Sequence, residues 1–125
     1  MDRKAFDDIA TEFQIKLYET AVSLGRDTIE LLAELAELYT RTGEYEKGLS
    51  LDKTLVQREP DNPIFLYNLA CSLSLVNQID KAYMTLDQAL NLGFNDIKLL
   101  LEDRDLKNLH KDPRWSDLLK RIGNE

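Results

Sequence analysis

A pattern that returns after 34 residues constrains the fold more than any other feature of this 125-residue chain. Residues 29–62 are followed in register by residues 63–96, and apolar or small residues recur at equivalent positions. The matching pairs are Leu32 and Leu66, Leu35 and Leu69, Ala36 and Ala70, Tyr39 and Leu73, Gly48 and Ala82, and Leu55 and Ala89. A period of this length is typical of a stacked helical repeat, in which each unit packs on its neighbours. We therefore expect a chain built to bind another protein.

Apolar residues at helical spacing predict several helices along the chain. Residues 2–24 contain no proline or glycine, and their apolar stripe predicts one helix of about six turns. Gly25 should end this helix in a left-handed conformation, and Asp27 should cap the next one together with Glu30. Further helices are expected at residues 28–42, 45–58, 63–76 and 79–92, followed by a short final helix from Pro113.

Turn and cap residues support these boundaries. Gly43 should form the turn of the first repeat, and Asn77, which tolerates the left-handed conformation, takes its place in the second. Asn62 should cap the helix that begins at Pro63. Each repeat is therefore predicted to be a hairpin of two helices.

Packing accounts for two further residues. Gly48 costs about 1 kcal/mol of helix propensity relative to alanine, which predicts a close helix approach at Ala36. Trp115 is the one tryptophan, and we expect it to anchor the final helix on the preceding ones. The aliphatic residues that share its helix face are Leu118, Leu119 and Ile122.

Composition narrows the classes of partner and compartment. The net charge is −7, whereas proteins that bind nucleic acids or anionic membranes need a positively charged surface. We therefore expect neither kind of partner. Cys71 is the one cysteine, which excludes an internal disulfide and favours a reducing compartment. The polar N-terminal segment does not resemble a signal peptide, and no apolar run is long enough for a membrane span. These features predict a cytoplasmic protein.

The two repeats resemble tetratricopeptide repeats. The residues that carry the resemblance are Leu35-Ala36, Leu69-Ala70, Tyr39, Gly43, Tyr45, Pro60, Ala82 and Ala89, whereas Leu32 and Leu66 replace the usual tryptophan. Residues 106–115 also resemble the segment that closes such arrays in many bacterial proteins. The resemblance implies an all-α fold, a right-handed superhelix of about seven helices. It divides the single domain 1–125 into a half-repeat (1–28), two repeats (29–62 and 63–96) and a degenerate closing repeat (97–125).

Members of this family bind a peptide or a helix in a concave groove lined by the first helix of each repeat. Carried over by register, the resemblance implies these partner-binding residues: Glu30, Glu34, Glu37, Arg41, Tyr67, Asn68, Cys71 and Lys98. One branch of the family holds C-terminal carboxylates with a lysine, asparagine and arginine clamp. Asn68 and Lys98 match that clamp, but acidic Glu37 and Glu102 would repel a carboxylate, so we do not expect that ligand.

The groove residues have alternative interpretations. Glu30, Glu34 and Glu37 share one side of their helix and could bind a basic partner, or they could form an ordinary solvated face. Tyr67 and Cys71 could offer an apolar floor to an amphipathic partner, or they could pack against a neighbouring helix. No metal or cofactor is expected, because the acidic residues lack converging ligands from other segments.

The sequence therefore predicts a non-catalytic adaptor or scaffold. No enzyme is expected, since His110 is the one histidine and should lie in solvent, while Cys71 should be an inert buried thiol. The alternative is self-association: the helix at residues 2–24 is apolar nearly all round, with Phe13 and Tyr18 among its side chains, and could form a homodimer interface.

Overall fold

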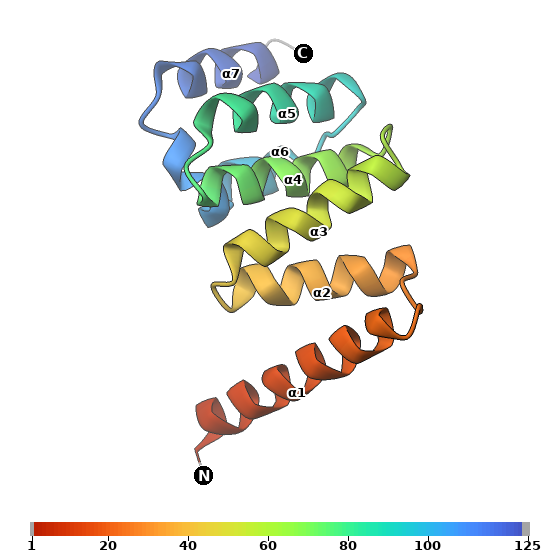
Figure 1. Cartoon of the computed structure of the whole chain (residues 1–125). Helices are drawn as coiled ribbons and strands as arrows, with labels where there is room; N and C mark the ends of the chain where they lie inside the picture. The colour runs from red at the N-terminus through yellow and green to blue at the C-terminus, as the bar shows by residue number, and fades with distance from the viewer. Residues whose placement is uncertain (1, 124–125) are drawn as a thin grey trace. The chain divides into compact units, whose positions relative to one another are not determined.

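The computed structural model describes residues 2–123, and every regular element in that range is a helix. Residues 2–123 form seven α-helices and one 3-10 helix, and Figure 1 labels the α-helices. They are α1 (Arg3–Ser23), α2 (Ile29–Arg41), α3 (Tyr45–Arg58), α4 (Pro63–Leu75), α5 (Ile79–Asn91), α6 (Ile97–Glu102), η1 (Arg104–Leu109) and α7 (Pro113–Gly123). The predicted all-α class is confirmed. The chain forms two compact units, Met1–Leu51 and Asp52–Glu125, and the boundary falls within α3.

Local signals place most helix ends where the sequence predicts them. Gly25, Gly43 and Asn77 have φ values of 83°, 86° and 62°, the left-handed conformation that ends a helix. The side chain of Asn62 accepts hydrogen bonds from the backbone nitrogens of Ile64 and Phe65, at 3.0 and 3.3 Å. These ends depend on a few neighbouring residues, which is why the sequence alone predicts them.

The predicted cap of α2 is wrong by one residue. Thr28, and not Asp27, is the N-cap, and its hydroxyl oxygen accepts a hydrogen bond from the backbone nitrogen of Leu31 at 3.2 Å. Thr28 has the extended conformation of a cap residue, with φ −64° and ψ 156°. Glu30 then lies one position too early for a capping box, because the third helical residue is Leu31.

In the first unit, α1 packs beside α2 and the start of α3 approaches α2 closely. A Cβ atom on Gly48 would lie 2.8 Å from the hydroxyl oxygen of Thr40 and 3.5 Å from the carbonyl oxygen of Ala36. The predicted close approach at Gly48 is therefore confirmed. The core of this unit comes mainly from α2, whose buried residues are Leu32, Leu35, Ala36, Leu38 and Tyr39.

In the second unit, α4 and α5 form a tight hairpin, and η1 packs on α4. The central side chains are Leu86 of α5, Leu100 of α6, and Leu106 and Leu109 of η1, all without exposed surface. The ring of Tyr67 stacks on Phe94 at a centroid distance of 4.2 Å. Segments beyond the second repeat thus complete the core that the α4–α5 hairpin begins.

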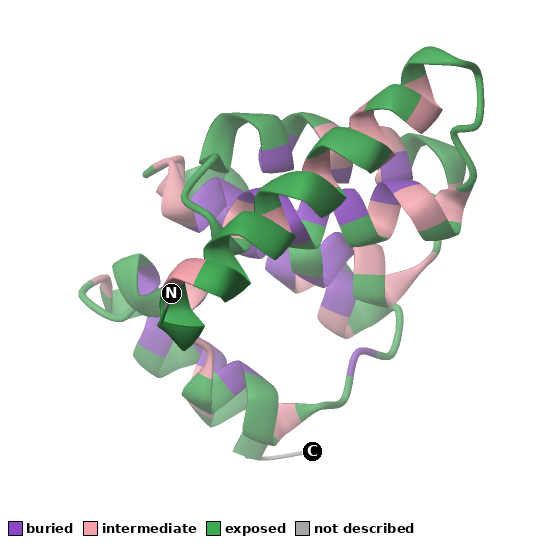
Figure 2. Cartoon of the chain, turned by 90° about the horizontal axis from the view of Figure 1, so that it is seen from below, coloured by how far each residue is buried: buried purple, intermediate pink, exposed green. Residues whose placement is uncertain are grey.

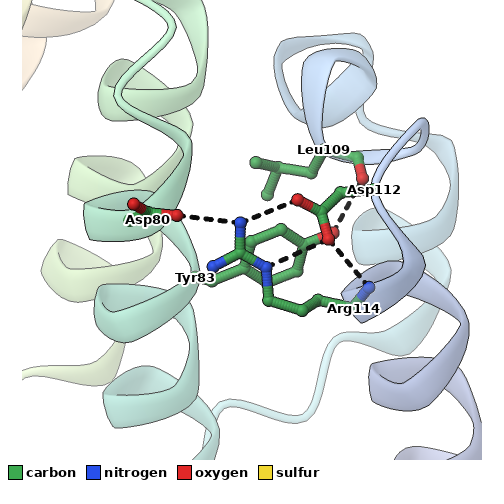
Figure 3. Close-up of polar contacts among 5 residues, drawn as sticks. All are labelled: Asp80, Tyr83, Leu109, Asp112 and Arg114. Carbon is green, nitrogen blue, oxygen red and sulfur yellow. Dashed lines mark hydrogen bonds and ion pairs between the residues drawn. The ribbon is translucent and has the colours of Figure 1, made fainter.

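Helix α7 closes the second unit through a network centred on Arg114 (Figure 3). The Arg114 guanidinium lies 2.9 Å from the Asp80 carboxylate and 2.7 Å from the Asp112 carboxylate. It also lies over the ring of Tyr83, with its central carbon 4.6 Å from the ring centroid. The Tyr83 hydroxyl donates to the carbonyl oxygen of Leu109 at 2.7 Å. Trp115 is 9% exposed, as expected for an anchor of this helix.

Candidate functional site

Two tyrosine–glutamate hydrogen bonds join α1 to α2. The Tyr18 hydroxyl of α1 donates to Glu34 of α2, and the Tyr39 hydroxyl of α2 donates to Glu19 of α1, both at 2.5 Å. Burial raises the pKa of Tyr39 well above its ordinary value, and the Glu19 hydrogen bond and the charges of Glu19 and Glu44 raise it further. Tyr39 therefore remains a neutral donor, and the two bonds fix the register of the two helices.

Next to this contact, α1, the end of α2 and the start of α3 enclose a cleft of about 590 Å³. Its lining residues are Asp8, Thr11, Glu12, Ile15, Lys16, Glu19, Tyr39, Arg41, Thr42, Glu44 and Lys47. All of them belong to the first unit. The volume lies within the range of about 300–1,000 Å³ that ligand-binding clefts usually have.

The walls of the cleft carry charges of both signs. Glu12 and Lys16 lie exposed on the α1 wall, and Arg41 lies exposed on the α2 wall. The ammonium group of Lys47 lies 5.5 Å from the ring centroid of Tyr39, within the range of a cation–π contact. The cleft thus offers charged side chains of both signs that a partner could pair with, while the ring of Tyr39 is only 7% exposed and belongs to the core.

The predicted acidic strip leads into this cleft. Glu30, Glu34, Glu37 and Arg41 follow one another at spacings of four, three and four residues, so they share one line along α2. All four are exposed, and Arg41 is also a lining residue of the cleft. The carboxylate of Glu34 is engaged by Tyr18, which leaves Glu30 and Glu37 as the open acids of the strip.

The other predicted site residues lie in the second unit. Asn68 and Lys98 are exposed, but Tyr67 and Cys71 are only 2% and 6% exposed. Asp103 covers both, because its carboxylate accepts a hydrogen bond from the Tyr67 hydroxyl at 2.7 Å and contacts the Cys71 sulfur at 3.7 Å. Tyr67 and Cys71 therefore belong to the core and not to an open apolar floor, which is the packing alternative considered above.

Sequence reasoning missed the α1 wall of the cleft. Asp8, Glu12 and Glu19 lie at spacings of four and seven residues, a line that a helical wheel would have shown. We expected the first helices of the repeats to line the site, and α1 aligns with a second helix. The helical spacing of these three acidic residues is the sequence feature that could have predicted the α1 wall.

Cys71 and His110 are the two side chains that were considered above for catalysis. Burial raises the pKa of the Cys71 thiol well above its usual range, which makes it a poor nucleophile. The exposed His110 ring contacts Trp115 at a centroid distance of 4.3 Å. Between residues 2 and 123 no three His, Cys, Asp or Glu side chains are grouped to hold a metal ion, and no helix has the length and apolar character to cross a membrane.

No protein-family model matches the chain. A curated relative, a chloroplast protein from Arabidopsis thaliana, is 30% identical over 87 residues, which is 67% of this chain. The match spans about a quarter of that relative, 26% of its length. The name of that relative places it in the chloroplast and says nothing of an activity.

Proposed function

We propose that the chain is a non-catalytic protein-binding module that holds a segment of a partner along α2 and in the α1–α2 cleft. The observation that carries this proposal is the continuity of two features: the strip of Glu30, Glu37 and Arg41 ends in the cleft. A cleft lined by open charged side chains suits an extended peptide or a helix of another protein. Such binding needs no reactive group.

We further propose that the module is a tetratricopeptide array with the right-handed superhelical arrangement of that family. Equivalent repeat positions support it, because Leu32 and Leu66 are both buried, as are Ala36 and Ala70. The turn residues Gly43 and Asn77 also share a left-handed conformation. We also propose an adaptor or scaffold role in the cytoplasm, which the single cysteine supports. Imaging of a fluorescent fusion in the source cells would test the compartment.

The partner should be basic or amphipathic. Glu30 and Glu37 are the acids that a partner would meet along α2, and Glu12 with Asp8 makes the α1 wall of the cleft acidic. Lysine or arginine side chains of a partner would pair with these groups, and an apolar side chain between them would contact the partly buried Ile15 of the cleft. Because the paired groups are exposed, the affinity should fall as the salt concentration rises.

Selection of peptides from a random displayed library against the wild-type chain tests the proposal. The affinity of a selected peptide is then measured by fluorescence anisotropy for the wild type and for Glu12→Lys combined with Arg41→Glu. We expect at least a roughly tenfold loss of affinity, since one lost or reversed charge contact of this kind corresponds to about 1.4 kcal/mol. Circular dichroism checks that the variant remains folded.

A matched control carries the same exchange of charges in the second unit. Asp117→Lys combined with Lys111→Glu changes two exposed residues and leaves the net charge unchanged, as the cleft variant does. It should bind the peptide with wild-type affinity. An equal loss in both variants, or a library that yields no binder, would contradict a binding site in the cleft.

A further inference from the structure

Helix α1 has a second apolar face that stays largely exposed within its unit. Five side chains form this face, here named the α1 stripe, with exposed fractions given in parentheses: Phe6 (63%), Ile9 (53%), Phe13 (70%), Leu17 (55%) and Leu24 (72%). At 100° per residue they lie within one narrow sector of the helix. Tyr18 and Glu19, which reach α2, point to the opposite side. Figure 2 shows α1 as mostly exposed, with intermediate residues in between.

The stripe is large for the surface of a small protein. A phenylalanine side chain can bury roughly 150–250 Å², so Phe6 and Phe13 together leave about 200–330 Å² in water. With the three aliphatic side chains the stripe exposes on the order of 500 Å², near the upper end for the largest apolar patch of a typical monomer. Two such stripes would together bury about 1,000 Å², the lower limit for a specific interface.

We propose that the α1 stripe binds the α1 stripe of a second copy of this chain in an antiparallel arrangement. Centring the two-fold axis at the level of Ile15 places Phe6 opposite Leu24 of the second copy and Phe13 opposite Leu17 of the second copy. Ile9 then faces the small Ala21 of the second copy. Since every contact occurs twice, the stripe is self-complementary in this register.

The charges beside the stripe favour the same arrangement. Glu12 and Lys16 lie on one flank of the stripe, and neither belongs to an ion pair within residues 2–123. In the antiparallel register, Glu12 lies two residues, about 3 Å along the axis, from the level of Lys16 of the second copy. Two reciprocal ion pairs can therefore form at the rim, while the helix dipoles oppose each other.

This inference goes beyond the proposed peptide-binding function. The stripe lies on the side of α1 away from α2, and none of its five residues lines the cleft. A dimer would therefore carry two open clefts, and each proposal can fail without the other. Glu12 and Lys16 are shared by the rim and the cleft, so variants at those two positions are not used to test the dimer.

Light scattering over a concentration series tests the pairing. We expect a weak dimer with a dissociation constant in the micromolar range, so at about 300 μM the wild type should approach twice the 14.4 kDa mass of one chain. Phe13→Glu should raise the dissociation constant at least about 30-fold, because symmetry places the new carboxylate in the interface twice. Phe13 is 70% exposed, so the substitution should leave the helix content of the monomer unchanged.

Met84→Glu is the matched control. Met84 of α5 is also a large apolar residue, 67% exposed, and lies outside the stripe. This variant should dimerise like the wild type. A wild-type chain that stays at 14.4 kDa throughout, or a control that dissociates as readily as Phe13→Glu, would overturn the proposal.

A cross-link tests the antiparallel direction. Gln14 flanks the stripe one residue from the proposed axis, so Gln14→Cys should place two thiols close together across the dimer. A short bismaleimide should then link the two copies, whereas the wild type should not be linked, because its Cys71 is buried. A dimer that is intact yet gives no cross-link at position 14 would exclude this register.

Discussion

Helices α1 and α4 show how differently two helices of one chain can be used. None of the 21 residues of α1 is buried, whereas seven of the 13 residues of α4 are. Helix α4 packs against α5 and η1, while α1 packs mainly against α2 within its unit. The second unit therefore buries more than half of the residues of α4 in its core. In the first unit, α1 leaves apolar and charged side chains on the surface, where our two proposals place binding.

The largest expected loss of stability comes from a substitution in the core of the second unit. Leu106 of η1 has no exposed surface, so Leu106→Ala should lower the free energy of unfolding by about 2–5 kcal/mol, the range for a fully buried leucine. Urea denaturation followed by circular dichroism measures this. Ile15→Ala, at a partly buried position of α1, should cost less than half as much. Equal costs would remove the contrast between the two units.

A smaller effect should come from Asp52, the buried carboxylate of the second unit. Burial raises its pKa from 3.8 to about 6, although the Ser72 hydroxyl donates a hydrogen bond to it, which acts in the opposite direction. Between pH 4 and 6 the folded chain therefore holds a proton that the unfolded chain has released. This group costs increasing stability as the pH rises through that window, up to about 3 kcal/mol above it.

Asp52→Asn should remove that cost. The variant should be more stable than the wild type at pH 7.5 by up to about 3 kcal/mol, and the difference should vanish near pH 4. Urea titrations of both proteins at several pH values give the comparison, and other carboxylates cancel because both proteins share them. A difference that is constant with pH would show that the Asp52 charge is not the cause.

Removing the Tyr39 hydroxyl, which bonds α2 to α1, should lower the free energy of unfolding by a smaller amount. Tyr39→Phe removes the hydroxyl that donates to Glu19, and we expect a loss of about 1 kcal/mol. Hydrogen exchange should become faster in α1 and remain unchanged in α4 and α5. Tyr83→Phe is the counterpart in the second unit, where the hydroxyl donates to Leu109, and it should speed exchange near α7 instead. Identical exchange patterns would contradict this separation.

The smallest effect is expected at Gly48, and its sign should depend on Thr40. In the wild type a new methyl group would lie 2.8 Å from the Thr40 hydroxyl oxygen, and this clash offsets the gain in helix propensity of about 1 kcal/mol. Gly48→Ala should therefore be neutral or slightly destabilising. In a Thr40→Ala background the same change should stabilise the chain by several tenths of a kcal/mol, which a double-mutant cycle detects.

The sequence predicts those parts of the structure that depend on neighbouring residues. The bounds of α3 and the left-handed turn at Asn77 agree with expectation, since caps, glycines and prolines act within one helical turn. The N-cap at Thr28 differs because Asp27 and Thr28 are both good cap residues, and local chemistry barely separates them.

The site could be predicted only in part. The acidic strip on α2 follows from helical spacing, so Glu30, Glu37 and Arg41 are exposed on one line as expected. The burial of Tyr67 depends on Asp103, 36 positions later in the sequence, where the repeat pattern breaks off. The periodicity of the repeats therefore cannot predict the contact between Tyr67 and Asp103.

The dependence of the α4–α5 hairpin on η1 and Arg114 has a consequence for synthesis on the ribosome. Residues 63–91 emerge well before Leu106, Leu109 and Arg114, which complete their core and close it. Until those later residues leave the ribosome, Leu86 and its neighbours have an unfinished core and are open to chaperones and proteases. A nascent chain that stalls before residue 106 should therefore be degraded faster than one that includes residues 106–114.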